Sequence, residues 1–366
     1  MVARSHQIVS RTRNSPLDFS LIEQFELDAG EDVSAQIIID ERIWHPYTID
    51  VENGALVFLD MPPDIDLSQE AFVFPRQFEE ASRALLVPYR ELMALSAQVT
   101  LPENITFIFS IGRCGSTLLH QIFNQIEGVN SYSEPDTSTI LSLFWQEKAM
   151  PDSLVADIVE ATTKLQIHAL TKDSNQVVFK FRSQVNALMP FYLERFPQAK
   201  TIFMYRNPLT WARSMFRFLM TFFDDDTMTM DEINLRTRAY PAEIQAQIAN
   251  YLDMSKKRFY RIEQIALILI FQLEIYLQYA GTHKLFALHY EDMLADPQTV
   301  MRSLLNFCDI PQSELAKALQ GFERDSQAGT EIAQNFESQE LDTEGERLFL
   351  DVLNKHPQLG DKDFRL

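Results

Sequence analysis

The chain has 366 residues, of which 46% are hydrophobic and 23% charged, a composition typical of a globular protein with an ample core. Its formal charge of −20, from 52 acidic and 32 basic residues, argues against nucleic acid or an anionic membrane surface as a partner, because affinity for either depends largely on Lys and Arg. An anionic ligand must therefore bind in a local basic pocket. The two cysteines exclude a disulfide framework and a cysteine metal cluster.

The first hundred residues have a pattern of their own. Three apolar segments predict short strands: 35–40, 47–51 and 55–61. The Glu-Asn-Gly sequence at 52–54 predicts a hairpin turn between the last two, and residues 78–99 have a helical pattern. The sequence therefore predicts an N-terminal extension over residues 1–100 that contains β-strands, without indicating what it is for.

From about residue 104, apolar strands alternate with helical segments. Each predicted strand is a nearly continuous apolar run, as in parallel strands that are buried on both faces: 105–110, 176–182, 200–206 and 284–290. This alternation predicts an α/β fold with a three-layer, doubly wound parallel sheet over residues 101–366. Ligands of such sheets bind beyond the carboxyl ends of the strands.

The segment FIFSIGRCGSTLLHQIF, residues 107–123, passes from the first of these strands through a glycine turn into a helical pattern. Gly115 lets the backbone approach an anion, Arg113 can neutralise its charge, and Ser116 and Thr117 offer hydroxyl groups at the helix start. The turn lacks the Gly-x-x-x-x-Gly-Lys-Ser/Thr spacing of nucleoside-triphosphate P-loops. Alternatively, the Ser and Thr merely cap the helix.

A second segment with polar residues after a strand is TIFMYRNPLTWARSMFRF, residues 201–218. The predicted strand ends at Arg206, Asn207-Pro208 makes the turn, and a helix begins near Leu209. Ser214 follows Arg206 by eight residues, about two turns into that helix. Taken alone, this pair is best explained as a surface arginine and an ordinary helical serine.

The most apolar segment, residues 265–279, is interrupted by Gln272, Glu274 and Gln278. It is too short and too polar to span a bilayer, so it predicts a buried helix. The basic N-terminal stretch contains no continuous apolar segment and does not resemble a signal peptide. The sequence therefore predicts a cytoplasmic protein without a membrane span.

Together, Arg-Cys-Gly-Ser-Thr-Leu-Leu after one strand and Arg-Asn-Pro with a serine eight residues on resemble the PAPS-dependent sulfotransferase family, which has a P-loop-like fold. The segment 285–311, with its Tyr-Glu-Asp-Met, is similar to the late strand and helix of that family, and the resemblance covers roughly residues 104–330. In the family, the first loop holds the 5′-phosphosulfate of 3′-phosphoadenosine 5′-phosphosulfate (PAPS), and the Arg–Ser pair holds the 3′-phosphate. The resemblance implies these nucleotide-binding residues: Arg113, Cys114, Gly115, Ser116, Thr117, Leu118, Arg206 and Ser214.

The resemblance also implies catalytic residues, with one departure. Many members carry Lys-Ser/Thr-His on the second strand, with His as the general base. Here Lys180 matches the Lys but Arg182 stands at the His position, and arginine stays protonated. Members that act on protein tyrosine and on sugars carry a Glu where this chain has Glu134, which we predict to be the base, with Asp136 in reserve and a plain loop acid as the alternative. Lys180 would stabilise charge on the bridging oxygen, and Arg113 would hold the transferring group.

Three further positions follow from the resemblance. The late loop that closes over the 3′-phosphate corresponds to residues 322–333, which keep a glycine but lack the usual Arg-Lys-Gly, and its candidate contacts are Arg324, Ser326, Gln327 and Gly329. The aromatic residue that often stacks on adenine is Leu118 here, so adenine packing is unassigned. His120 is predicted to be structural, and residues 218–262 to form a helical wall or lid over the acceptor.

The implied function is transfer of the sulfuryl group from PAPS to a hydroxyl or amine of a small-molecule acceptor by in-line displacement, with PAP as product and no metal. The sequence does not identify the acceptor and leaves a homodimer open. Two alternatives remain. A small-molecule kinase would need a Lys-Ser/Thr after the glycine, which is absent. A catalytically idle PAP-binding or assembly protein would explain the missing His and the altered late loop.

Overall fold

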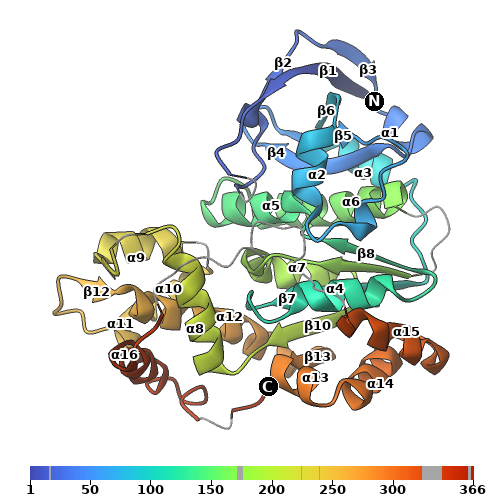
Figure 1. Ribbon diagram of the computed structural model, residues 1–366. Coiled ribbons are helices and arrows are strands. Elements are labelled where there is room, and N and C mark those ends of the chain that lie inside the picture. Colours follow the sequence, from blue (N-terminus) through green and yellow to red (C-terminus); the bar gives the residue numbers. More distant parts are fainter. Residues whose placement is uncertain (16–17, 171–175, 224, 239, 324–339, 362–363) are drawn as a thin grey trace.

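The computed structural model describes residues 1–366 except 16–17, 171–175, 224, 239, 324–339 and 362–363. Two β-sheets lie one above the other, with helices between them (Figure 1). The lower sheet belongs to the predicted α/β part of the chain, and the upper sheet to the N-terminal extension.

The lower sheet consists of parallel strands in the order β13-β10-β7-β9-β8. Their bounds are β7 Asn104–Ser110, β8 Val129–Ser133, β9 Gln176–Lys180, β10 Lys200–Tyr205 and β13 Leu285–His289. The four predicted strands are confirmed, and the fifth strand, β8, ends directly before Glu134. Because the strands are parallel, the loops after β7, β8, β9 and β10 meet at one edge of the sheet.

Helices connect and cover these strands: α4 Ser116–Asn124, α5 Asp136–Gln146, α6 Asp152–Leu170, α7 Met189–Arg195, α8 Pro208–Leu219, α9 Met230–Thr237, α10 Ala242–Gln245, α11 Ile248–Tyr251, α12 Arg261–Ala280, α13 Tyr290–Ala295, α14 Pro297–Phe307, α15 Leu315–Gln320 and α16 Thr343–Leu353. By length and composition α12 is the one helix of the described chain that could cross a membrane, but 72% of its apolar window is buried inside the structure. It is the buried core helix predicted at 265–279.

The upper sheet is antiparallel, with the order β2-β1-β6-β5-β4 and β3 paired to β1. Its elements are β1 Val2–Arg11, β2 Phe25–Leu27, β3 Glu31–Ser34, α1 Ile37–Asp40, β4 Trp44–Asp50, β5 Ala55–Asp60, α2 Val73–Glu80, β6 Arg83–Pro88 and α3 Tyr89–Ser96. The predicted hairpin is confirmed: β4 and β5 pair antiparallel, and Gly54 takes a φ of 62° in the turn.

Two predictions in this region are wrong. Residues 35–40 contain the short helix α1 instead of a strand, because its β-branched residues have no neighbouring strand to pair with. Residues 78–99 are not one helix, because their middle forms strand β6 between α2 and α3. This strand pairs with β1 on one side and β5 on the other, and that pairing outweighs the helical spacing.

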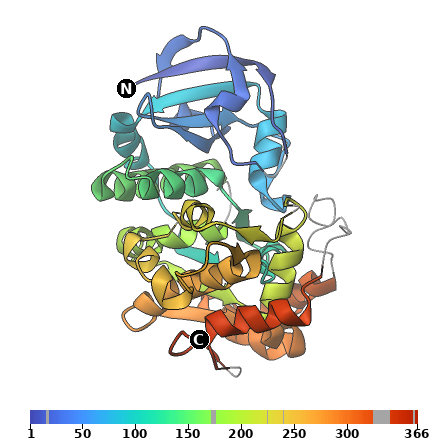
Figure 2. The same cartoon turned by 90° about the vertical axis from the view of Figure 1, so that its left-hand side faces the viewer.

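The two parts of the chain share one hydrophobic core. Strand β4 packs on α5 and α6, and α3 packs on α6. Both Figure 1 and the view turned by 90° in Figure 2 place α5 and α6 between the sheets. Trp44 and Phe58 of the upper sheet belong to the same buried cluster as Phe107 of the lower one. A smaller cluster on the outer face of the upper sheet contains Tyr47 and Phe78.

Candidate active site

The glycine turn after β7 has a backbone shape that suits an anion. Gly112, Arg113 and Gly115 have φ angles of 69°, 51° and 82°, so the chain winds left-handed where it enters α4. A Cβ on Gly115 would lie 2.5 Å from the ring of Tyr290, which leaves room only for glycine. Gly115 is the N-cap of α4 and no side chain caps it, so the predicted alternative of Ser or Thr capping does not occur. The first-turn N–H groups of α4 remain for an anion.

The Cys114 side chain faces the protein interior and interacts with neighbouring groups of the turn, among them Ser110 and the main chain of Ser116. Its side chain is buried, with Sγ 3.5 Å from the main-chain oxygen of Met204 on β10. Burial raises the pKa of the Cys114 thiol to about 11. The thiol therefore points into the core and stays protonated at neutral pH.

We expect neither cysteine to react quickly with an aromatic disulfide reagent while the protein is folded. Cys308 is also buried, and burial raises its thiol pKa to about 12. At about pH 8 both thiols lack the reactive thiolate form. The absorbance of the released aromatic thiolate should rise slowly with the native protein. After addition of denaturant it should correspond to two thiols per chain. Rapid reaction of one thiol in the native state would contradict the buried position of its side chain.

Arginines gather at the turn. Arg113 Nε donates to Ser214 Oγ on α8 at 3.4 Å, and Arg206 Nη1 donates to the main-chain oxygen of Arg113 at 3.4 Å. Burial, followed by the charges of Arg206 and Arg217, lowers the pKa of Arg113. Arg206 pairs with Glu291, but among the described residues no carboxylate pairs with Arg113, so the Arg113 guanidinium can neutralise an anionic ligand.

The predicted pair Arg206 and Ser214 therefore lies at the glycine turn, and both residues contact Arg113. The Arg113 guanidinium contacts Ser214 and lies 5.4 Å from the ring centre of Phe218, also on α8. The predicted contact of Arg113 with the transferring group stays a prediction.

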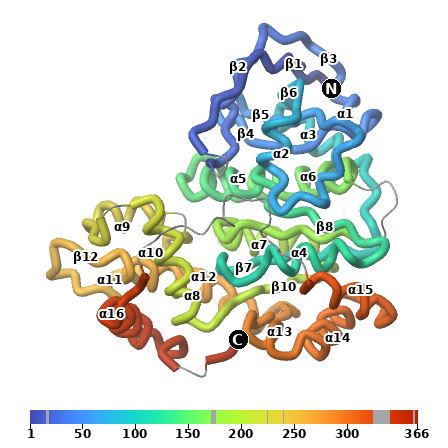
Figure 3. Tube along the Cα trace, viewed as in Figure 1, coloured from blue at the N-terminus to red at the C-terminus, as the bar shows by residue number. Residues whose placement is uncertain are grey.

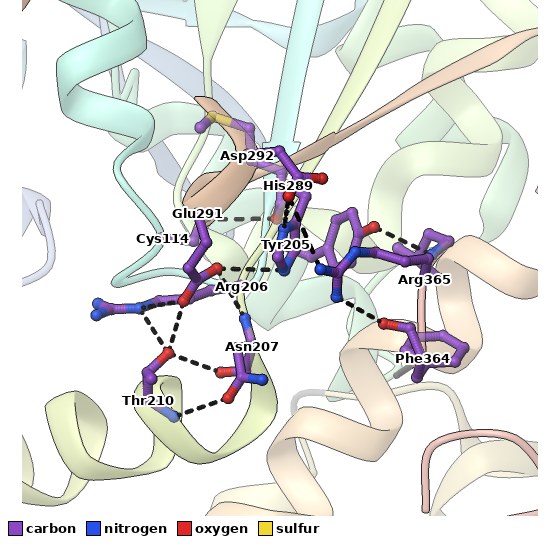
Figure 4. Close-up of polar contacts among 12 residues, drawn as sticks. Cys114, Tyr205, Arg206, Asn207, Thr210, His289, Glu291, Asp292, Phe364 and Arg365 are labelled. Atoms are coloured by element: carbon purple, nitrogen blue, oxygen red, sulfur yellow. Dashed lines mark hydrogen bonds and ion pairs between the residues drawn. The ribbon is translucent and has the colours of Figure 1, made fainter. Parts of the chain in front are cut away.

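A carboxylate network holds Arg206 in place (Figure 4). Arg206 Nε donates to Thr210 Oγ1 at 3.1 Å and to Glu291 Oε1 at 3.4 Å. Glu291 also accepts hydrogen bonds from the Thr210 hydroxyl and the Asn207 N–H. Burial alone would raise the pKa of Glu291, but these hydrogen bonds lower it, so the group stays charged and orients Arg206. The ring centre of Tyr290 lies 4.8 Å from the Arg206 guanidinium carbon.

Glu291 and Tyr290 are functional candidates that the sequence did not single out. Both belong to the Tyr-Glu-Asp-Met segment, which the sequence marked only as a family feature. Glu291 Oε2 also lies 3.2 Å from His289 Nε2, and the other ring nitrogen of His289 lies 3.2 Å from Asp292 Oδ1 (Figure 4). Residues at the end of β13 thus hold Glu291, which in turn orients Arg206 at the end of β10.

Glu134 and Lys180 form a second cluster at the same edge of the sheet. The main-chain N–H of Glu134 donates to the Lys180 oxygen at 2.6 Å, because β8 pairs with β9. Lys180 Nζ forms an ion pair with Glu134 Oε1, and Arg182 Nε donates to Glu134 Oε2 at 3.2 Å. Glu134 has a φ of 56° and its side chain is 14% exposed. The structure therefore brings the predicted base, the predicted cation and Arg182 together.

Asp136, the reserve base, and the nearby His120 are both less suitable as bases than Glu134. The Asp136 side chain is fully buried, with Oδ2 accepting the Ser20 N–H at 2.7 Å. His120 uses both ring nitrogens, one at 2.7 Å from Ser131 Oγ and the other at 3.1 Å from the Glu70 oxygen. Burial, followed by the charge of Lys180, lowers the pKa of His120 to about 3. These contacts support the predicted structural role of His120.

Other predicted contacts are less defined. Arg324, Ser326, Gln327 and Gly329 lie outside the described residues. Leu118 is partly buried against the core, and no adenine contact follows from its position. The segment 218–262 contains the predicted helices, α9, α10 and α11, and also two short paired strands, β11 Thr227–Met228 and β12 Phe259–Tyr260. Its role as a wall or lid over the acceptor stays a prediction.

A glycine turn that leads into an uncapped helix, with arginines gathered at the carboxyl edge of a parallel sheet, gives this α/β protein a site suited to an anionic group such as phosphate or sulfate. A profile of the sulfotransferase domain matches residues 103–350. The chain therefore belongs to the sulfotransferase family, and its activity is sulfuryl transfer.

Three solved structures illustrate the similarity. Mouse sulfotransferase SULT7A1 complexed with PAP is 15% identical, with 63% of this chain and 68% of that chain covered and a TM-score of 0.34. A sulfotransferase from Alicyclobacillus acidocaldarius is 15% identical, with 61% of this chain and 92% of that chain covered and a TM-score of 0.37. The sulfotransferase domain of the Synechococcus PCC 7002 olefin synthase is 16% identical, with 70% of this chain and 94% of that chain covered and a TM-score of 0.38. No curated protein matches, and the family assignment rests on the profile.

Proposed function

We propose that the sulfuryl donor is PAPS and that the acceptor is a hydroxyl or amine of a small molecule. The observation that carries this proposal is the meeting of two anion-binding features at one turn. The uncapped N-terminus of α4 suits the 5′-phosphosulfate, and the adjacent Arg113, Arg206 and Ser214 suit the 3′-phosphate. A donor with two anionic ends fits both features at once.

The residues present pass a test of fit for this donor. The Tyr290 ring leaves room only for glycine at position 115, and no side chain caps the helix that begins there, so the first-turn N–H groups of α4 can face a ligand. Arg206 is held from behind by Glu291 and by the ring of Tyr290. Its guanidinium is therefore oriented before the ligand arrives, which reduces the cost of ordering it on binding.

The second cluster supplies the acid–base chemistry. The acceptor oxygen or nitrogen attacks sulfur and forms a new bond to it, while the bond from sulfur to the bridging oxygen breaks and its electron pair leaves with PAP. Glu134 takes the proton from the acceptor. Lys180, bound to Glu134 in the structure, is released from that charge as Glu134 becomes neutral, so its own charge can stabilise the bridging oxygen.

Replacing Arg206 with Ala should weaken PAP binding by about 2–4 kcal/mol, the cost of removing one partner from a largely desolvated charge pair. AMP, which lacks the 3′-phosphate, should bind poorly to the parent and lose little in the variant. Isothermal calorimetry measures both ligands. Arg213→Ala is the control, because that arginine lies on the same helix but pairs with Glu346 on α16. Unchanged PAP binding by the Arg206 variant would place the 3′-phosphate elsewhere.

Two measurements separate the proposed function from its alternatives. Calorimetry with PAP in the absence of Mg²⁺ should show tight binding, whereas a kinase would require ATP and Mg²⁺. Labelled PAPS should transfer its label to members of a panel of phenols, alcohols and amines. Binding of PAP with no transfer to any acceptor, water included, would indicate the idle binding protein instead.

A further inference from the structure

A chain of polar contacts links the N-terminal extension to the proposed base. Arg182 Nε donates to Glu134 Oε2 at 3.2 Å, and Arg182 Nη1 forms an ion pair with Asp136 Oδ1 at 3.4 Å. The other oxygen of Asp136 accepts the main-chain N–H of Ser20 at 2.7 Å. The backbone of the extension is therefore connected to Glu134 through two side chains, both of which are largely or fully buried.

Aromatic residues of the extension cover the two cations of this cluster. The Arg182 guanidinium carbon lies 4.0 Å from the ring centre of Phe74 and 5.4 Å from that of Phe19. Lys180 Nζ lies 5.3 Å from the ring centre of Phe72. The Arg182 side chain is 11% exposed, and an aromatic face over a cation stabilises it more strongly when water is excluded. Arg182 is therefore held between carboxylates of the α/β part and rings of the extension.

The segment that carries these rings is itself fixed against the strand that leads to Glu134. The Ser133 hydroxyl donates to the Ala71 main-chain oxygen at 2.6 Å. The main-chain oxygen of Glu70 lies 3.1 Å from His120 Nε2 on α4. The short 3₁₀ helix η2 (Leu67–Gln69) contacts both α4 and β8, and the chain trace in Figure 3 follows this path from η2 into α2. The segment 67–71 of the extension therefore packs directly against α4 and β8 of the α/β part.

We propose that Arg182 is a positioning residue for Glu134, and that the extension holds Arg182 in place through Phe74 and the main chain of Ser20. The extension then supports the catalytic site through Phe74 and Ser20. The planar guanidinium binds Glu134 and Asp136 along two edges while its face rests on Phe74, a geometry that lysine cannot reproduce. The inference rests on the proposed role of Glu134 as base.

The first test compares Phe74→Leu with Phe78→Leu. Both residues lie on α2 and are buried, but Phe78 packs in the cluster on the outer face of the upper sheet. Phe74→Leu should lower kcat for phenol by about 10- to 100-fold, because small misplacement of a catalytic group has effects of this size. Phe78→Leu should keep the parental kcat. PAP affinity, measured by calorimetry, should stay near parental in both variants.

The acceptor itself provides a readout that a general loss of structure would not produce. 4-Nitrophenol is more acidic than phenol and needs less help to lose its proton. In Phe74→Leu the loss of kcat should therefore be several-fold smaller with 4-nitrophenol than with phenol. Equal losses with both acceptors would show that Phe74 only supports the fold, and would overturn the proposal.

The second test replaces Arg182. Arg182→Gln should lower kcat for phenol by about 10- to 100-fold with little change in the KM for PAPS, and Arg182→Lys should recover part of the loss. In combination with Glu134→Gln, Arg182→Gln should add little, because residues that act through one group are non-additive. Independent, multiplying losses would overturn the proposal. Should Arg182→Gln fail to bind PAP through misfolding, the Phe74 and Phe78 pair decides. Parental turnover by Glu134→Gln alone would instead refute the proposed base.

Discussion

Replacing Glu134 with Gln is expected to lower transfer to phenol by about 10²–10⁴-fold, the usual contribution of a general base. Glutamine keeps the size of the side chain, and its oxygen can still accept hydrogen bonds from Lys180 and Arg182, but it cannot take up the acceptor's proton. PAP affinity should change little, because Glu134 contacts the cations of the second cluster and not Arg206 or Ser214 at the turn. Initial rates with labelled PAPS and calorimetry with PAP measure the two quantities.

The control for this variant is Glu127→Gln. Glu127 lies just before the same strand, β8, but it is exposed and pairs with Lys317 on α15. It should keep parental turnover. If Glu134→Gln also keeps near-parental turnover while His120→Ala or Asp136→Asn does not, the base is one of those residues and the assignment of Glu134 is wrong.

Gly115→Val is expected to reduce PAP affinity by at least about 100-fold, which corresponds to about 2.7 kcal/mol. Two causes combine. Gly115 has a φ of 82°, which side chains rarely adopt, and its first added carbon would lie 2.5 Å from the Tyr290 ring. Tyr290 in turn lies against Arg206, so relief of the clash displaces both the turn and the arginine. PAP calorimetry measures the effect, with circular dichroism as the check on folding.

Gly128→Val separates backbone strain from obstruction of the site. Gly128 has a φ of 77°, but a Cβ there would meet nothing within 4 Å. This variant should therefore lose about 1–2 kcal/mol of stability from the left-handed backbone alone and bind PAP as the parent does. Parental PAP binding by Gly115→Val would show that the turn does not hold the 5′-phosphosulfate.

The α/β part of the fold was predictable because its strands are buried on both faces and appear as continuous apolar runs. That regularity also placed Gly115 and Arg206 after β7 and β10, which are neighbours in the sheet, at the edge where parallel strands end. Glu134 follows β8 at the same edge, but it was found through the family resemblance. The N-terminal sheet was harder to predict. Strand β1 is largely exposed, with polar and charged residues among its apolar ones. In β6 the apolar residues have the spacing of a helix, and the segment is a strand because it pairs with β1 and β5.

The contacts that complete the site left no local pattern in the sequence. The Ser20 N–H and Asp136 are 116 residues apart in the chain, and the Arg206–Glu291 pair is 85 residues apart. Each residue by itself is an ordinary loop acid, helix start or strand end. Arg182 was visible only as a departure from the family pattern, and its partners became visible only in the folded structure.

The core shared by the two sheets has a consequence for the order in which the chain is made on the ribosome. The N-terminal sheet is complete in sequence at Pro88, yet its inner face is covered by α5 and α6, which are synthesised later. Until then the nascent chain carries apolar residues such as Trp44 and Phe58 with no partner layer. Surfaces of this kind recruit chaperones or self-associate. The inner face of the N-terminal sheet, which is translated first, can therefore be covered only after α5 and α6 of the α/β part have been made.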